Sequence, residues 1–201
     1  MEESFNEKQS LELITGMINK VKNKFTESGT LYLVWGVAVL ICSITQFVLW
    51  NFFDYKQAYY VWFVTWIVYI YQAIFLFRKK KNERVKTYTD EILGYVWICF
   101  IVCFFIMIFI LIYSKNFELI YSAILVLYAI PTFLSGAILK AKPLIIGGIC
   151  CWVLACTSLF IPLNYHLLLI STAVLVAWII PGIYLRKKYL AQSKFAQTLI
   201  N

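Results

Sequence analysis

Charged residues are scarce in this 201-residue sequence, and they are absent from the middle of its long apolar stretches. Only 14% of the residues are charged and 62% are apolar, whereas a soluble globular domain has about a quarter charged residues and about half apolar ones. This scarcity excludes a soluble enzyme of ordinary type and a disordered protein. It is typical of an integral membrane protein.

Groups that carry out chemistry inside a membrane are also scarce. Transport and catalytic sites there usually contain an ionisable side chain, but the sole histidine, His166, lies at the edge of an apolar stretch. The H-E-x-x-H, G-x-S-x-G and P-loop patterns do not occur. The six cysteines lie within apolar stretches, without a histidine or carboxylate placed to complete a metal site. We therefore expect no enzymatic activity, no metal and no cofactor.

Six apolar stretches are long enough to cross a membrane. A spanning helix needs about 20 apolar residues, and backbone groups in lipid must be satisfied within the segment, which favours helices. The sequence therefore predicts an all-α fold, with a bundle of six transmembrane helices in residues 31–185 between a segment of residues 1–30 and a tail of residues 186–201. The predicted spans are Leu31–Trp50, Tyr59–Phe77, Ile92–Tyr113, Phe117–Leu139, Leu144–Ile161 and Tyr165–Leu185.

Basic residues are distributed unevenly between the two sides of this predicted bundle. All but two of the 18 lysines and arginines fall in the N-terminal segment, in the loops after the second and fourth spans, or in the tail; the exceptions are Lys56 and Lys115. The positive-inside rule then predicts a multi-pass protein of the bacterial inner membrane with both termini in the cytoplasm. The net charge of +8 is a topology signal, and we expect no direct nucleic-acid binding, which needs a basic face on a folded domain.

Short outer connections group the six spans into three hairpins whose entries and exits look alike. Pro131 and Pro181 fall in the cytoplasmic halves of the fourth and sixth spans, and each frees a carbonyl one turn earlier. Two interpretations stay open: all inward-ending spans are simply apolar and then basic, or a hairpin is triplicated around an inward-opening cavity. The residues predicted to line a ligand site in that cavity are Gln72, Tyr128, Pro131, Ser135 and Pro181.

Residues 1–30 form the one sizeable polar region. Ser4-Phe5-Asn6-Glu7 fits a capping box, and the apolar residues that follow at helical spacing predict an amphipathic cytoplasmic helix that Ser28-Gly29 ends. Three uses stay open: lying on lipid headgroups, pairing through residues 5–27 with itself or a cytoplasmic partner, or packing against the bundle's own loops. The predicted contact residues are Leu11, Ile14, Ile18, Val21 and Phe25, with Lys20 and Lys24.

Several runs of the sequence are distinctive: residues 133–149, Tyr32-Leu33-Val34-Trp35-Gly36, Ile179-Ile180-Pro181-Gly182 and Ser10-Leu11-Glu12-Leu13-Ile14. With them the chain resembles, over nearly its whole length, an uncharacterised family of small six-span inner-membrane proteins common in Bacteroidota. The resemblance implies an inner-membrane location and assigns no catalytic residue. Members of the family look as if they are often encoded beside small winged-helix regulators, which implies a regulatory or stress-response role.

Two functions from different classes are compatible with these observations. The first is a non-enzymatic membrane protein with a regulatory or structural role, indicated by the absence of intramembrane charge, the amphipathic segment and the basic loops. The second is a small transporter or lipid-interacting protein for neutral or apolar cargo, indicated by the hairpin pattern and the paired prolines.

Overall fold

The computed structural model describes residues 7–55, 57–82 and 88–198, with side chains for residues 29–55, 57–78, 91–188 and 190–191. The secondary structure of this part of the chain is helical, with no strand among the described residues, which confirms the all-α prediction. Short 3₁₀ turns precede α2, α4 and α6, and one π-helical turn separates α6 from α7. The elements are α1 (Glu7–Phe52), η1 (Ala58–Trp62), α2 (Phe63–Asn82), α3 (Tyr88–Ser114), η2 (Phe117–Leu119), α4 (Ile120–Ile138), α5 (Lys142–Ser158), η3 (Leu163–Tyr165), α6 (His166–Val174), η4 (Leu175–Ile179) and α7 (Ile180–Thr198).

Five helical segments of the described chain are long and apolar enough to cross a membrane. They are Gly29–Phe52, Ala58–Arg78, Glu91–Ser114, Phe117–Ile138 and Leu163–Lys188. The fifth predicted span is shorter than the sequence suggested, because α5 ends at Ser158 and has only 17 residues. At 1.5 Å per residue this is about 25 Å of helix, somewhat less than the roughly 30 Å of a bilayer core. Pro143 lies in its first turn, where a proline is tolerated, and Pro162 follows shortly after its end.

The predicted end of the N-terminal helix at Ser28-Gly29 is wrong. A single helix, α1, runs from Glu7 to Phe52. A glycine that ends a helix usually adopts a positive φ, and no described glycine does so. Gly29 instead permits close packing on α7, since a Cβ placed there would lie 3.3 Å from the Gly182 carbonyl oxygen. Ser4 to Asn6 of the predicted capping box, and the side chains of its amphipathic stripe, lie outside the described residues.

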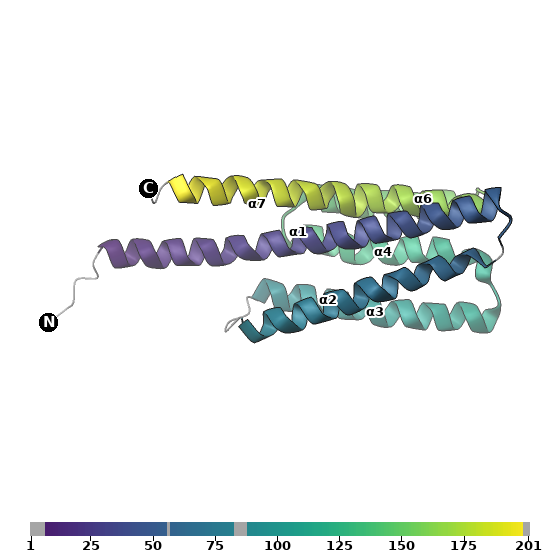
Figure 1. Ribbon diagram of the computed structural model, residues 1–201, viewed down its shortest axis with the longest axis horizontal. Helices are drawn as coiled ribbons and strands as arrows, with labels where there is room; N and C mark the ends of the chain where they lie inside the picture. Colours follow the sequence, from purple (N-terminus) through teal and green to yellow (C-terminus); the bar gives the residue numbers. More distant parts are fainter. Residues whose placement is uncertain (1–6, 56, 83–87, 199–201) are drawn as a thin grey trace.

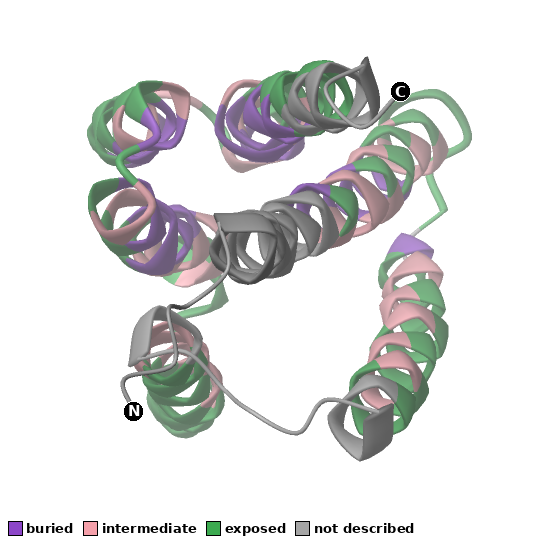
Figure 2. Cartoon of the chain, turned by 90° about the vertical axis from the view of Figure 1, so that its left-hand side faces the viewer, coloured by how far each residue is buried: buried purple, intermediate pink, exposed green. Residues whose placement is uncertain are grey.

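The core of the bundle is formed by α1, α4, α5 and the continuous rod made by α6, η4 and α7 (Figure 1). The most extensive packing joins α4 with α5 and α1 with the α6–α7 rod. Neither pair is one of the hairpins predicted from the sequence, so the three-hairpin division is not what organises the core. Helices α2 and α3 lie outside it: α2 packs on α1, and α3 packs on α4 (Figure 2).

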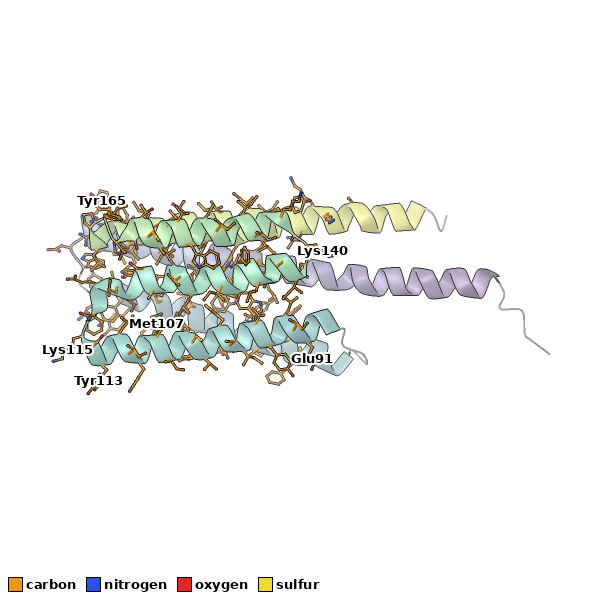
Figure 3. The ribbon with its side chains drawn as sticks, turned by 180° about the vertical axis from the view of Figure 1, so that it is seen from behind. Glu91, Met107, Tyr113, Lys115, Lys140 and Tyr165 are labelled. Atoms are coloured by element: carbon orange, nitrogen blue, oxygen red, sulfur yellow. The ribbon has the colours of Figure 1, made fainter. Side chains whose placement is uncertain are left out.

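Charged side chains mark the two ends of the bundle. Lys140 and Glu91 lie toward one end and Lys115 lies at the other, while the helices between them carry apolar side chains (Figure 3). Lys115 and Lys140 each have a positive φ, of 57° and 51°, and they follow the last turns of α3 and α4. After Lys140, the Ala141 amide donates to the Gly136 carbonyl at 2.8 Å, which satisfies a carbonyl at the end of α4.

Candidate functional site

The residues predicted to line a ligand site do not all lie together. Tyr128, Pro131 and Ser135 lie on the inner face of α4, and Pro181 begins α7 beside the π-helical turn. Gln72 is on the peripheral helix α2, where its side-chain oxygen accepts a hydrogen bond from Trp35 Nε1 of α1. Gln72 therefore fastens α2 to α1.

The two prolines lie in closely packed surroundings. Both side chains are less than 2% exposed, whereas a side chain lining a void large enough for water keeps some accessible area. Ser135 is fully buried, and Tyr128 is 8% exposed. These groups belong to the packed core, so a ligand would reach them only after the helices separate.

An aromatic cluster lies beside these residues, formed by Tyr32, Trp97, Phe100, Tyr128 and Trp178. Its closest ring pair joins Trp178 and Tyr128, whose centroids lie 4.8 Å apart, and the Trp178 centroid lies 6.5 Å from that of Trp97. Trp97 in turn contacts Tyr32 of α1, with a centroid separation of 6.0 Å. The cluster joins α1, α3, α4 and η4, and offset or edge-on ring pairs of this kind stabilise packing beyond their contact area.

The π-helical turn η4 has a local cause in the sequence. Pro181 has no amide hydrogen, and its ring crowds the carbonyl one turn earlier. The helix widens over Leu175–Ile179 directly before it, which is a usual way to accommodate such a ring. The widened turn carries Trp178 toward α4, where its Nε1 donates to Thr132 Oγ1 at 2.9 Å. Thr132 itself donates to the Tyr128 carbonyl at 2.7 Å.

A second group of polar side chains, the Gln46 network, joins three elements near the opposite end of the bundle. Gln46 Nε2 donates to the Tyr121 hydroxyl at 2.9 Å, and Gln46 Oε1 accepts from Trp62 Nε1 at 2.5 Å. Gln46 is only 3% exposed. One amide thus uses a donor and an acceptor to hold α1, η1 and α4 together.

His166 lies against this network. Its Nε2 is 2.8 Å from the Ile161 carbonyl oxygen; a carbonyl can only accept, so the neutral ring carries its proton on Nε2. The ring contacts Tyr121 edge-on at 6.3 Å between centroids. Its Nδ1 is buried without a hydrogen-bond partner among the described residues. The sequence placed His166 at the edge of an apolar stretch; in the structure it is the first residue of α6, and its side chain is 5% exposed.

Two serine pairs also connect helices through polar contacts. Ser43 of α1 shares a hydrogen bond with Ser171 of α6 at 2.8 Å, and Ser122 of α4 shares one with Ser158 of α5 at 2.7 Å. All four side chains are buried. The polar residues within the core therefore serve mainly to connect helices.

Replacing Gln46 with leucine should lower the free energy of unfolding by about 1–3 kcal/mol, because it leaves Trp62 Nε1 and the Tyr121 hydroxyl unpaired and each interhelical bond contributes roughly 0.6–1.7 kcal/mol. Unfolding in mixed micelles, followed by tryptophan fluorescence, measures the change. Thr172→Val is the matched control, since the exposed Thr172 hydroxyl bonds only the Leu168 carbonyl of its own helix. Equal effects of the two changes would contradict the role assigned to Gln46.

Metal-binding groups of three or more histidine, cysteine or acidic residues do not occur in the described part of the chain. The six cysteines are free thiols; Cys42 and Cys151 are buried, and Cys99 and Cys103 are exposed on α3. No family model, no curated protein and no solved structure matches the chain.

Proposed function

We propose that the chain is a six-span protein of the bacterial inner membrane with both termini in the cytoplasm. Five helices have the length and composition of spans. The shorter α5 is supported as the sixth span because it packs along α4 more extensively than any other pair of elements packs. The start of α1, the end of α7 and Lys140 lie at one end of the bundle (Figures 1 and 3), which fits the positive-inside orientation.

Within that membrane we propose a non-enzymatic regulatory or structural role, in which residues 7–28 form an arm that binds a partner. The observation that carries this proposal is the continuity of α1 from Glu7 to Phe52. The arm extends the axis of a spanning helix away from the bundle (Figure 1), so it does not turn to lie along the membrane surface. Because of this direction, we infer that the apolar stripe of the arm binds a cytoplasmic protein, or the arm of a second copy, and not lipid headgroups.

Continuity of the helix also supports a way for the arm to act on the membrane core. Just after the arm, α1 contacts α7 closely through Gly29 and Gly182, and it contacts the π-helical turn through Gly36, where a Cβ would lie 2.7 Å from Ile179 Cγ1. A helix held so closely moves as a unit. Binding that tilts or rotates the arm would therefore also shift the packing of Trp178 and the aromatic cluster.

Changing the apolar stripe of the arm should abolish partner capture or self-association. We expect the double variant Ile14→Asp and Ile18→Asp to lose it, because two charges enter the apolar face, whereas Thr15→Asp on the neighbouring face should retain it. Affinity purification from mild detergent, with chemical cross-linking, measures both. If the unchanged chain shows neither a stoichiometric partner nor self-association through the arm, the proposed role is wrong.

Transport of neutral or apolar cargo is the weaker alternative. It requires an inward cavity at Pro131 and Pro181, and the complete burial of both prolines speaks against one. The aromatic cluster also fills the space between α3, α4 and η4.

A further inference from the structure

Two of the six cysteines form a pair on the outer side of α3. Cys99 and Cys103 are both exposed, whereas Cys42 and Cys151 are buried in the core. Residues four apart on a helix lie on the same face, one turn above the other. The two thiol groups are close enough to interact through a hydrogen bond. Cys99 and Cys103 thus form a dithiol, here called the α3 dithiol, that takes no part in the packing of the core.

The α3 dithiol faces away from the rest of the bundle. On the opposite side of α3, Trp97 and Phe100 contact the rings of Trp178 and Tyr128 in the core. Cys99 follows Trp97 by two residues, which is about 200° around the helix. Few residues of the α3 span are buried, and α3 lies at the edge of the bundle (Figure 2). Both thiols are therefore open to whatever surrounds α3.

The depth of the α3 dithiol decides which compounds reach it. Cys103 lies near the centre of the segment Glu91–Ser114, about 17 Å from either end at 1.5 Å per residue. Its exposed neighbours Ile98, Val102 and Ile106 are apolar. With α3 as a membrane span, as proposed above, the surroundings of the pair are hydrocarbon, where a charged species is strongly disfavoured. A compound that reaches the pair is therefore neutral and soluble in lipid.

Ordinary metal ions do not fit the α3 dithiol. Zn²⁺ takes four ligands in a structural site, and no group of three or more histidine, cysteine or acidic residues occurs in the described part of the chain. Cu⁺ held by two thiolates leaves a net negative charge, which hydrocarbon disfavours. A ligand that suits the pair bonds two neighbouring sulfur atoms, supplies the rest of its own coordination shell and leaves no net charge.

We propose that the α3 dithiol is a binding site for trivalent organoarsenicals. Trivalent arsenic forms three single bonds in a pyramid, so one bond to carbon and two to neighbouring sulfur atoms complete its shell. When R–As(OH)₂ condenses with the two thiols, two As–S bonds form, two As–O bonds and two S–H bonds break, and each proton leaves with a hydroxide as water. Arsenic stays trivalent and sulfur stays reduced, so no oxidant is needed. The product is neutral, and its organic group faces the lipid.

The other cysteines provide a comparison within the same chain. Cys150 and Cys151 are consecutive and so point to different sides of α5, and Cys151 is buried. Cys156 is exposed, but it lies five residues after Cys151 and six after Cys150. Neither spacing brings two exposed thiols onto one helix face, so we expect one arsenical per chain. Cys156 serves as the exposed single thiol.

Titration of the full chain in liposomes with phenylarsine oxide, whose hydrate is an R–As(OH)₂ compound, tests the proposal. One equivalent should remove two reactive thiols and add one phenylarsenic group to the intact mass. The adduct should resist excess 2-mercaptoethanol but not 2,3-dimercaptopropanol. Cys99→Ser and Cys103→Ser should each weaken binding at least about a hundred-fold, because the second As–S bond depends on the high effective concentration of the neighbouring thiol. Cys156→Ser should bind as the unchanged chain does.

A spacing variant keeps the number of thiols constant. Cys103→Ser combined with Ile101→Cys retains six cysteines but places the second thiol two residues from Cys99, on another face of α3. It should bind as weakly as Cys103→Ser alone. The proposal is overturned if the unchanged chain forms no adduct that resists 2-mercaptoethanol, if the adduct survives either serine substitution or the change of spacing, or if Cys156→Ser abolishes it. The arm contains no cysteine, so none of these results bears on partner binding by the arm.

Discussion

Replacing Trp178 with alanine is expected to lower the free energy of unfolding by about 3 kcal/mol. The side chain is 3% exposed, contacts the rings of Tyr128 and Trp97, and donates a hydrogen bond to Thr132. In a membrane the unfolded helices stay in lipid, so the usual transfer of apolar surface from water is missing. The remaining cost is that of the cavity left by the ring, roughly 140 Å³. In protein cores each Å³ of cavity lowers the free energy of unfolding by about 24 cal/mol.

Two further variants separate the contribution of the hydrogen bond from that of the buried ring. Trp178→Phe keeps most of the ring and removes the bond to Thr132, and it should cost about 1 kcal/mol. Phe109→Ala removes a ring that is 70% exposed and should cost much less than Trp178→Ala. Denaturation by SDS in mixed micelles gives all three values. A Trp178→Ala variant as stable as Phe109→Ala would show that the aromatic cluster does not hold the core together.

The fold class was predictable because a bilayer imposes its dimensions on the sequence. The long apolar runs correspond to long helices, and the mild polar residues within them do make bonds between helices. Which residues pair was not predictable. Gln46 looks the same in the sequence whether it bonds Trp62, Tyr121 or neither, because the choice depends on how the helices are rotated against one another. That rotation is fixed by contacts such as Trp178 on Tyr128, between residues 50 positions apart.

The end of the N-terminal helix shows where local signals mislead. Ser28-Gly29 is a reasonable helix stop by its residue types, yet α1 continues through it. An apolar run follows the pair and packs on α7. Gly29 lies at this contact, where it allows the two helices to approach closely and does not turn the chain. Of the two prolines in the candidate site, Pro181 indicated correctly where helix geometry is disturbed, whereas α4 runs unbroken through Pro131. They did not indicate whether the disturbed turn is open to a ligand or filled by Trp178.

The sequence does not show which of its glycines lie at close contacts between helices. Alanine substitutions at two of them can measure this difference in packing. Gly94 and Gly147 both lie inside helices. A Cβ on Gly94 meets no atom within 4 Å, whereas one on Gly147 would lie 2.6 Å from Ala177 Cα and 3.1 Å from the Val176 carbonyl oxygen. Both neighbours are backbone atoms of the π-helical turn, so they cannot move aside as a side chain can.

Gly147→Ala is therefore expected to lower the free energy of unfolding by about 1–3 kcal/mol, the usual cost of inserting a carbon atom into a well-packed core. Gly94→Ala should instead raise it by up to about 1 kcal/mol, because alanine favours the helix and meets nothing. Thermal unfolding in detergent should move the two midpoints in opposite directions. A shared sign would mean that α5 does not approach η4 as closely as described; opposite signs would support the close approach of α5 to the turn that carries Trp178.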